Sequence, residues 1–180
     1  MKDINIGNQR LLHQHIVSNS FKTPEEVVKW MVAMQAQDYH QALWAIGLRM
    51  QSPTIADIEQ AIQERKILRT WPIRGTIHFV IAEDAKWMTA LSAPRRLAQD
   101  MRRLIELEIT DEILKRCRKI ISEALSGGKR RTRAAMMSLL EHNGMSTNGQ
   151  RGYHILWCMA QESLICFGPI EDKQHTFVLL

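Results

Sequence analysis

Apolar residues recur at helical spacing through the first 65 residues, which predicts a series of amphipathic helices. The predicted helical stretches cover residues 8–17, 23–34, 41–50 and 55–65. The second stretch begins with the spacing of a capping box, because Thr23 can cap the helix and Glu26 stands three residues further on. Pro24, between them, suits the first turn. The apolar face of this helix is predicted to extend to Met34.

After Arg65 the pattern changes to one that is typical of β-strands. Two apolar runs, 67–71 and 76–81, flank a short basic turn at 72–75. Helices followed by two strands around such a turn have the order of a winged-helix module, in which the hairpin is the wing. An isolated hairpin on an α+β domain gives the same pattern and stays an alternative.

Helical spacing returns at Glu83, and Pro94 is predicted to mark a boundary within it. Ser126-Gly127-Gly128 ends the last helix of this stretch and has the composition of a hinge. Thr132 then opens a short helix that ends at Asn143-Gly144, and a polar turn leads to a longer helix around residues 153–160. Apolar runs at 164–167 and 176–180 flank a turn-rich segment. This order again matches a helix-turn-helix followed by a wing.

We therefore predict a mainly α fold with small β-hairpin wings, built from tandem winged-helix modules. The predicted units are an N-terminal module at 1–94, a basic helical connector at 95–128 and a second module at 129–180. The chain stops at Leu180 inside an apolar strand pattern. This ending predicts that a longer parent chain continues beyond it.

The composition is that of a globular protein, with 45% apolar and 24% charged residues among 180. No apolar run has the length of a membrane span, and the first five residues lack the hydrophobic region of a signal peptide. We therefore expect a cytoplasmic, nucleoid-associated protein with no membrane partner. Cys117, Cys158 and Cys166 form no C-x-x-C pair and fall within apolar patterns, which predicts reduced core residues rather than a disulfide or a metal site.

The net charge of +5 is concentrated in one segment. Residues 95–133 hold twelve Lys and Arg against six Asp and Glu, so this segment carries +6 and the rest of the chain −1. Such a basic stripe is the electrostatic footprint of a polyanionic partner, and the predicted winged-helix order favours double-stranded DNA as that partner. A solvated helical face is the alternative.

Two groups of residues are predicted to contact DNA in the second module. The N-terminal turn of its second helix offers free amide groups to phosphate, and its Arg and Gln side chains can reach base edges. The basic residues just upstream would touch the phosphate backbone, which gives salt-sensitive affinity without sequence information. The predicted contacts are Asn148, Gln150, Arg151 and His154 on the helix, and Lys129, Arg130, Arg131 and Arg133 upstream.

A polar cluster at 34–40 is a candidate for chemistry. Gln35 and Gln37 stand two residues apart, so they do not share a helical face and converge only if the helix ends or unwinds there. Carboxamides are not general bases near neutral pH, but they can orient a water and donate hydrogen bonds. Asp38 and His40 are acid–base candidates, although a lone histidine is more often structural. From these residues alone, a polar helix terminus is the plainer interpretation.

The turn at 72–75 supplies a third candidate. Arg74 stands at its tip, where a guanidinium could clamp a phosphate, and Gly75 permits close approach of the backbone. His78, in the following strand, could face a pocket and contact DNA or could fill the core, and the core is the commoner place. The sequence contains no P-loop, dinucleotide fingerprint, zinc-deaminase signature or nucleophile elbow, which disfavours those enzyme classes.

Three segments, in order along the chain, resemble signatures of the AlkZ/YcaQ family of bacterial winged-helix DNA glycosylases. They are 34–39 with 42–49, then 69–80, and finally 149–151 with the ending from Gly168. The resemblance implies tandem winged helices that enclose a DNA-binding channel. It also implies hydrolysis of the N-glycosidic bond of bulky N7-alkylated purines, including those in interstrand crosslinks, without a metal or nucleotide cofactor.

The same resemblance assigns the family's catalytic motif to Gln35-Ala36-Gln37. It implies that these amides position the attacking water and stabilise the developing positive charge on the sugar. Family members are longer, with a third winged helix and further β structure. We therefore expect a monofunctional DNA glycosylase when the full-length parent is intact. A non-catalytic winged-helix DNA-binding protein, either a transcription regulator or an architectural binder, is the main alternative, and a helical protein-interaction domain is a third.

Overall fold

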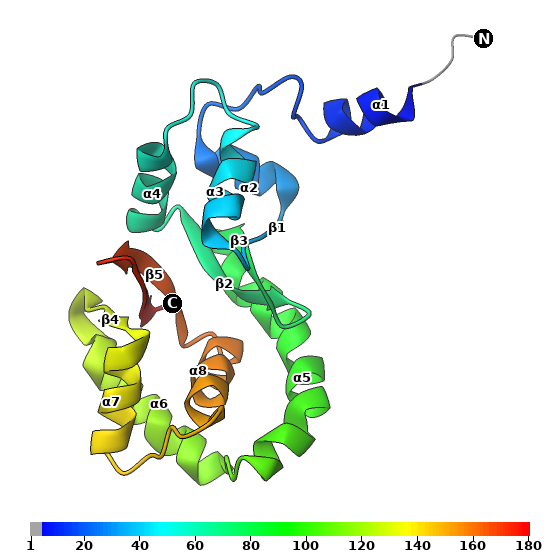
Figure 1. Ribbon diagram of the computed structural model, residues 1–180. Coiled ribbons are helices and arrows are strands. Elements are labelled where there is room, and N and C mark those ends of the chain that lie inside the picture. The colour runs from blue at the N-terminus through cyan, green and yellow to red at the C-terminus, as the bar shows by residue number, and fades with distance from the viewer. Residues whose placement is uncertain (1–4) are drawn as a thin grey trace.

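The computed structural model describes residues 5–180, and in it one order of helices and strands occurs twice (Figure 1). The first series is α2 (Pro24–Met31), β1 (Met34–Gln35), α3 (Tyr39–Gly47), α4 (Ile55–Gln63), β2 (Ile67–Ile73) and β3 (Thr76–Ile81). The second is α6 (Asp111–Leu125), β4 (Arg131–Thr132), α7 (Arg133–His142), α8 (Arg151–Gln161), β5 (Ile165–Glu171) and β6 (Gln174–Leu179). Outside the series lie α1 (Ile6–His13), α5 (Ala82–Glu106) and the 3-10 turn η1 (Ser126–Gly128). The signal-peptide prediction rests on residues 1–5, of which 1–4 lie outside the described residues.

The strands of both series form one six-stranded sheet in the order β1-β3-β2-β5-β6-β4, with every neighbouring pair antiparallel. The first series and the second series are called the two halves of the chain below. They meet at the β2–β5 pair, where Arg69 lies opposite Phe167. In Figure 1 the helices of the first series lie in the upper part of the view and those of the second in the lower part. The predicted mainly helical fold class with β-hairpins is confirmed.

The second helix ends earlier than its apolar pattern predicts. Its capping box is present, since the Glu26 N–H donates to Thr23 Oγ1 at 3.3 Å and the Thr23 N–H donates to Glu26 Oε2 at 3.2 Å. The helix stops at Met31, because Val32 adopts a positive φ of 63° that turns the chain out of the helix. Met34 is buried from strand β1 instead of from the helix. The prediction of a helical face as far as Met34 is therefore wrong.

The predicted boundary at Pro94 is also wrong, since α5 runs without interruption through it. Proline removes one helical hydrogen bond and crowds the preceding turn, so other contacts must hold the helix together there. Packing along β2 supplies them, with the Ser92 hydroxyl donating to the Pro72 carbonyl at 2.6 Å. A single 25-residue helix thus connects the two series along one side of the sheet (Figure 1).

The last hairpin is longer than the sequence pattern predicts. Its strands continue past Phe167 through an irregularity in register before Ile170, and they turn at Asp172 and Lys173. The β2–β3 hairpin has the same kind of irregularity between Thr70 and Ile73. A proline inside each irregular segment explains why the pattern there resembled a turn.

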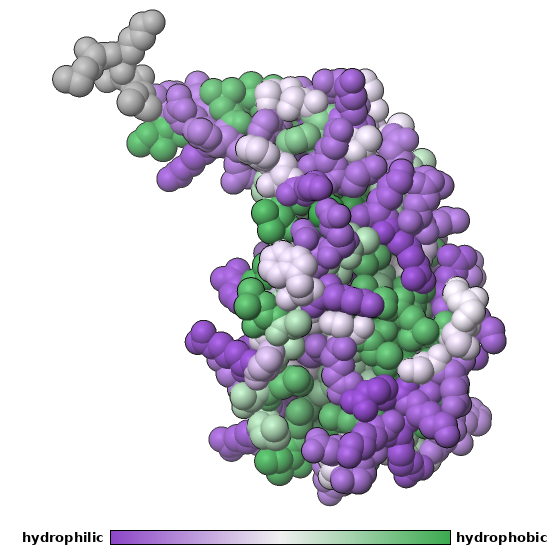
Figure 2. Space-filling model, turned by 180° about the vertical axis from the view of Figure 1, so that it is seen from behind, coloured by the Kyte–Doolittle hydropathy of each residue, from purple (hydrophilic) through white to green (hydrophobic). Residues whose placement is uncertain are grey.

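One hydrophobic core extends through both halves on one face of the sheet, and a smaller cluster lies on the other face. In the smaller cluster, Ala85 and Met88 of α5 pack on Leu68, Val80 and neighbouring strand residues. All three cysteines are buried and free, as predicted. The back of the molecule is mostly hydrophilic, with apolar side chains gathered between the polar ones (Figure 2). Among residues 5–180, no helix is long and apolar enough to span a membrane.

Candidate active site

An extended segment at the edge of the sheet carries the two candidate glutamines. It pairs with β3, and the Ala36 N–H donates to the Ile77 carbonyl at 2.8 Å. Met34 and Ala36 are buried, whereas Gln35 and Gln37 are exposed. Gln35 ends β1 and Gln37 lies in the bend after it, so this non-helical backbone allows both amides to reach one substrate. A helix would not allow it.

The Gln37 amide has a defined orientation because its oxygen accepts a hydrogen bond from the sheet. Gln37 Oε1 accepts from the Ile77 N–H at 3.1 Å, a donor that a regular ladder would pair with the Ala36 carbonyl. A backbone N–H can only donate, so the oxygen of the amide, not its nitrogen, must face it. The NH₂ group of Gln37 is therefore turned away from the sheet, where it can donate to a bound molecule.

Arg69 holds the backbone of this segment from the buried side. Its side chain is 4% exposed, and its Nε donates to the Ala36 carbonyl at 2.9 Å and its Nη2 to the Gln37 carbonyl at 3.3 Å. The guanidinium lies 4.6 Å from the ring centroid of Phe167 and 5.5 Å from that of Tyr39. Burial lowers the pKa of Arg69 to about 10, so the group stays charged at neutral pH. Carbonyl dipoles, aromatic faces and the nearby Asp38 carboxylate, which forms no ion pair with Arg69, stabilise this charge.

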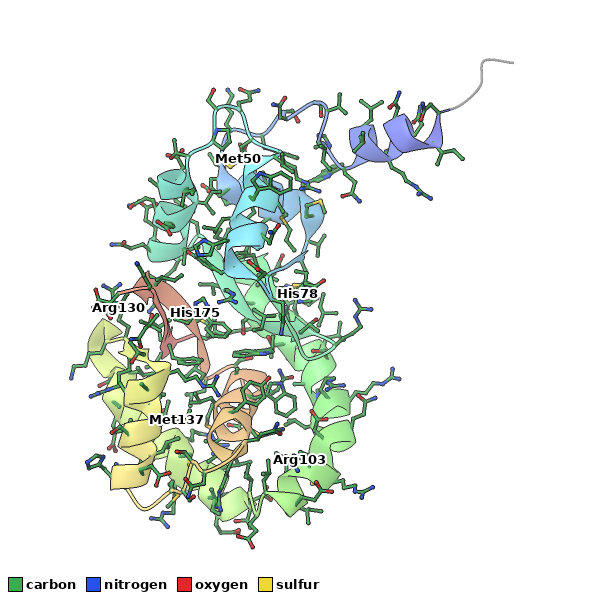
Figure 3. The ribbon with its side chains drawn as sticks, in the orientation of Figure 1. Met50, His78, Arg103, Arg130, Met137 and His175 are labelled. Atoms are coloured by element: carbon green, nitrogen blue, oxygen red, sulfur yellow. The ribbon has the colours of Figure 1, made fainter. Side chains whose placement is uncertain are left out.

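A third contact links Arg69 to the second half of the chain. Its Nη1 lies 3.2 Å from Nδ1 of His175, which comes from β6. Arginine only donates, so the imidazole must accept and is neutral when it makes this contact. Burial, followed by the charges of Arg69 and His40, lowers the pKa of His175. Figure 3 shows His175 where the two halves face one another.

A cavity of about 230 Å³ opens beside Gln37, between the two halves. Residues of the first half contribute the Gln37 amide and the Arg69 guanidinium to its lining, and residues of the second contribute His175 and Arg133. Most of the remaining wall is aromatic. The rings that line it are those of Trp71, Tyr153, Trp157, Phe167 and Phe177.

The β2–β3 hairpin places two predicted DNA contacts in different surroundings. Arg74 is exposed at the hairpin tip, and Gly75 next to it has a φ of 71° and lies under Arg96, whose Nε would be 2.9 Å from an added Cβ. His78 is 7% exposed, and its Nδ1 lies 3.0 Å from the Thr76 carbonyl, to which it can donate. Burial lowers the pKa of His78. The core interpretation of His78 fits this geometry, whereas a direct contact between this buried ring and DNA is disfavoured (Figure 3).

The predicted phosphate contacts of the second half lie together where η1, β4 and α7 meet. They are Lys129, Arg130, Arg131 and Arg133. Arg130 forms an ion pair with Glu171 at 3.6 Å (Arg130 is labelled in Figure 3). Arg133 is exposed, and its guanidinium lies 5.8 Å from the Tyr153 ring at the cavity. Arg133 is therefore the member of this group that lies next to the candidate glutamines.

The remainder of the basic stripe is divided between two helices and is partly neutralised. On α5, Arg96 pairs with Asp100, and two further arginines pair with Glu106. On α6, Arg118 pairs with Glu162. These pairs are exposed or half-buried, so each contributes little to stability and can exchange with a phosphate partner.

The first turn of α8 holds its predicted DNA contacts in intramolecular interactions. Gln150 Oε1 accepts from Arg103 Nη2 at 3.0 Å. The Arg151 side chain is 17% exposed and donates to the Glu108 carbonyl at 3.2 Å. The Nδ1 of His154 lies 2.9 Å from the backbone carbonyl four residues earlier.

Only the beginning of α8 is accessible to a large ligand. Residues 155–161 are all buried, and the helix packs against α5, α6 and the strands β2 and β5. Asn148 is exposed in the preceding turn. The buried length of α8 excludes the usual placement of a recognition helix along a DNA groove and leaves its N-terminal turn as the surface for contact.

The two acid–base candidates next to the glutamines are Asp38, which caps a helix, and His40, which is exposed. Asp38 caps α3, because its Oδ1 accepts from the Gln41 N–H at 3.0 Å. His40 is exposed, with its ring 5.5 Å from that of Tyr39. Burial raises the pKa of Tyr39 to about 12, so this phenol stays protonated. Among residues 5–180, no group of three or more His, Cys, Asp or Glu side chains could hold a metal ion.

Sequence reasoning did not select Arg69, Tyr153 or His175. An arginine in the middle of an apolar strand was the available signal for Arg69, because a buried charge needs fixed partners. Tyr153 and His175 reach the site only through the pairing of the two halves, for which no local pattern exists.

These features can be compared with known proteins. A family model described as DNA glycosylase AlkZ-like matches residues 28–179, so the chain belongs to the AlkZ-like DNA glycosylase family. Among solved structures, Streptomyces sahachiroi DNA glycosylase AlkZ is similar, with a TM-score of 0.69, 18% sequence identity and 95% of this chain covered. This chain covers 49% of that protein, so it spans about half of its length. A comparison with curated protein sequences finds no match.

Proposed function

We propose that this chain forms the DNA-binding and catalytic half of a DNA glycosylase that hydrolyses the N-glycosidic bond of bulky N7-alkylated purines, including those in interstrand crosslinks. The observation that carries the proposal is the exposed Gln35–Gln37 segment, which Arg69 anchors beside the cavity of a chain from the AlkZ-like family. Each half of the fold is proposed to be a winged-helix module, with its hairpin as the wing.

The chemistry suits neutral amides. An N7-alkylated purine is cationic while attached to the sugar and leaves as a neutral base, so the departing group needs no strong acid. The oxygen of a water molecule bonds to C1′ as the C1′–N9 bond breaks, the electron pair of that bond passes to the purine, and the proton of the water passes to solvent. The protein has to place the water and stabilise the cationic sugar.

The two amides are proposed to divide these tasks. Gln37 donates from its NH₂ group, because its oxygen is bound to the Ile77 N–H. Gln35 is free to present its carbonyl oxygen, which can accept from the attacking water or face the positive sugar. Arg69 is a positioning residue in this scheme, since it donates hydrogen bonds to the backbone carbonyls of Ala36 and Gln37.

Double-stranded DNA is the proposed partner, held mainly through its phosphates. Arg74 at the hairpin tip is exposed, and the Lys129–Arg133 segment is exposed or half-buried, with Arg133 in the lining of the cavity. Charges of this kind give salt-sensitive affinity that does not depend on sequence. We expect the slope of log K for duplex binding against log salt concentration to become shallower when these basic side chains are removed.

The test is release of N7-methylguanine from a duplex oligonucleotide by the chain and by its Gln35→Ala/Gln37→Ala variant. We expect release by the unaltered chain, and duplex binding without release by the variant. Arg10→Ala, in α1, is a matched surface control. Equal release by the chain and the double variant would refute the assignment of the two amides.

A second candidate is a winged-helix module that binds DNA without cleaving it, and the exposed side chains of Arg74, Lys129 and Arg133 favour it because phosphate contact requires no catalysis. This candidate predicts tight duplex binding with no release from any alkylated duplex. Binding that depends on Asn148 and Gln150 and differs between DNA sequences would support it, whereas release of an alkylated base would exclude it.

A further inference from the structure

We propose that the cavity between the two halves binds a single uncharged nucleobase, taken out of the DNA helix or released from it. The inference rests on the proposed function for the origin of the base, but the binding itself requires no catalysis.

The size of the cavity suits one heteroaromatic ring system. Its volume of about 230 Å³ is smaller than the roughly 300–1,000 Å³ of sites for drug-sized ligands. A base without its sugar and phosphate matches such a space better than a nucleotide does. The base would reach it beside Gln37, which stands in the lining next to the candidate catalytic segment.

The aromatic wall is ordered as a stack. The centroid of Trp71 lies 4.6 Å from that of Phe167, and Phe167 lies 5.1 Å from Phe177, with interplanar angles of 31° and 29°. The Arg69 guanidinium also lies 4.6 Å from the centroid of the Phe167 ring. Tyr153 is 40% exposed, so its ring is the part of the wall that an entering base meets first. Stacking on such rings accepts any base, because every base has a π-face.

The polar groups select an uncharged base that carries hydrogen-bond acceptors. The NH₂ group of Gln37 can donate to a ring nitrogen or a carbonyl oxygen, because the oxygen of this amide is bound to Ile77. Among the described residues the lining includes two arginines, Arg69 and Arg133, and no carboxylate. A cationic ring in the cavity would lie close to the buried positive charge of Arg69, and the repulsion between the two charges disfavours its binding. An N7-alkylated purine would therefore fit only after its glycosidic bond has broken and the ring has become neutral.

The test uses the fluorescent adenine isomer 2-aminopurine as a free base, whose emission is quenched when it stacks on aromatic rings. We expect saturable quenching by the chain, and an affinity at least about fivefold weaker in Tyr153→Ala, which loses one stacking surface. Tyr153→Phe keeps the ring and should retain the affinity. Trp44→Ala alters a separate cavity of about 610 Å³ at α3 and α4 and should change nothing.

Competition tests the charge preference. Neutral 9-methyladenine should displace 2-aminopurine, and the permanently cationic 7,9-dimethyladeninium should be at least tenfold weaker. Absence of saturable quenching, equal affinity in Tyr153→Ala, loss of affinity in Trp44→Ala or equal competition by the cation would each overturn the inference. Base release from DNA is scored separately. A chain that binds 2-aminopurine but releases no base leaves the inference standing, and a chain that releases base without binding 2-aminopurine refutes it while the proposed function stands.

Discussion

Arg69 is buried in the fold and binds the backbone of the candidate site, so its replacement tests both the stability of the fold and the anchoring of that backbone. Arg69→Met removes the hydrogen bonds to the Ala36 and Gln37 carbonyls and leaves the first of these buried without its partner. Bonds from a charged donor contribute roughly 1.5–3 kcal/mol each. Removal of the guanidinium offsets part of this, because burying its charge is itself unfavourable. We expect the free energy of unfolding to fall by about 2–3 kcal/mol.

The assay is urea unfolding combined with amide hydrogen exchange. The Ile77 N–H, which donates to Gln37 Oε1, should lose protection in Arg69→Met more than the rest of β3 does. Arg74→Met is the matched control, since it makes the same change at the exposed tip of the same hairpin, and we expect an effect within about 0.5 kcal/mol. Equal stability of Arg69→Met and Arg74→Met, with unchanged exchange at Ile77, would refute the anchoring role.

Three further properties follow from buried or charged groups. The lowered pKa values of His78 and His175 mean that the folded state binds fewer protons than the unfolded state near pH 6, so Tm should fall as the pH drops below about 6.5. His175→Gln should make Tm depend less on pH, and an unchanged dependence of Tm on pH would show that His175 does not contribute to it. Gly152→Ala should lower the free energy of unfolding by about 1–3 kcal/mol, because an added Cβ would collide with a side chain of α7, and an unchanged urea midpoint would contradict that. Lys129→Ala/Arg133→Ala should reduce the slope of log K against log salt for duplex binding by about 1.8, and a slope equal to that of the unaltered chain would show that neither residue touches phosphate.

Much of the fold could be predicted because its local signals agree with its packing. The capping box at Thr23 and Glu26, the strands on either side of Arg74 and the helix opened by Thr132 are all found where the sequence places them. The errors lie where tertiary contacts override a local preference. Pro94 does not end its helix, because α5 packs along β2 and the Ser92 hydroxyl, just before the proline, donates to the Pro72 carbonyl.

The candidate site was predictable only in part. The sequence indicated that Gln35 and Gln37 could converge if the helix ended before them, and the positive φ of Val32 ends it there. The orientation of the Gln37 amide could not be predicted from the sequence. Arg69 Nε occupies the Ala36 carbonyl, so the Ile77 N–H donates to Gln37 Oε1 instead, and no local sequence pattern indicates such a contact from a distant strand. The contribution of His175 depends on the pairing of β2 with β5, a contact between segments about a hundred residues apart.

The central claim is that the amides of Gln35 and Gln37 act together on the glycosidic bond. The most direct measurement is the single-turnover rate of N7-methylguanine release for the chain, Gln35→Ala, Gln37→Ala and the double variant, with duplex binding measured in parallel. Because residues that act as a unit are strongly non-additive, we expect each single change to reduce the rate at least about a hundredfold and the second to add little. Duplex binding should stay within a few-fold of that of the unaltered chain. A single variant that releases the base at the rate of the unaltered chain would contradict the account.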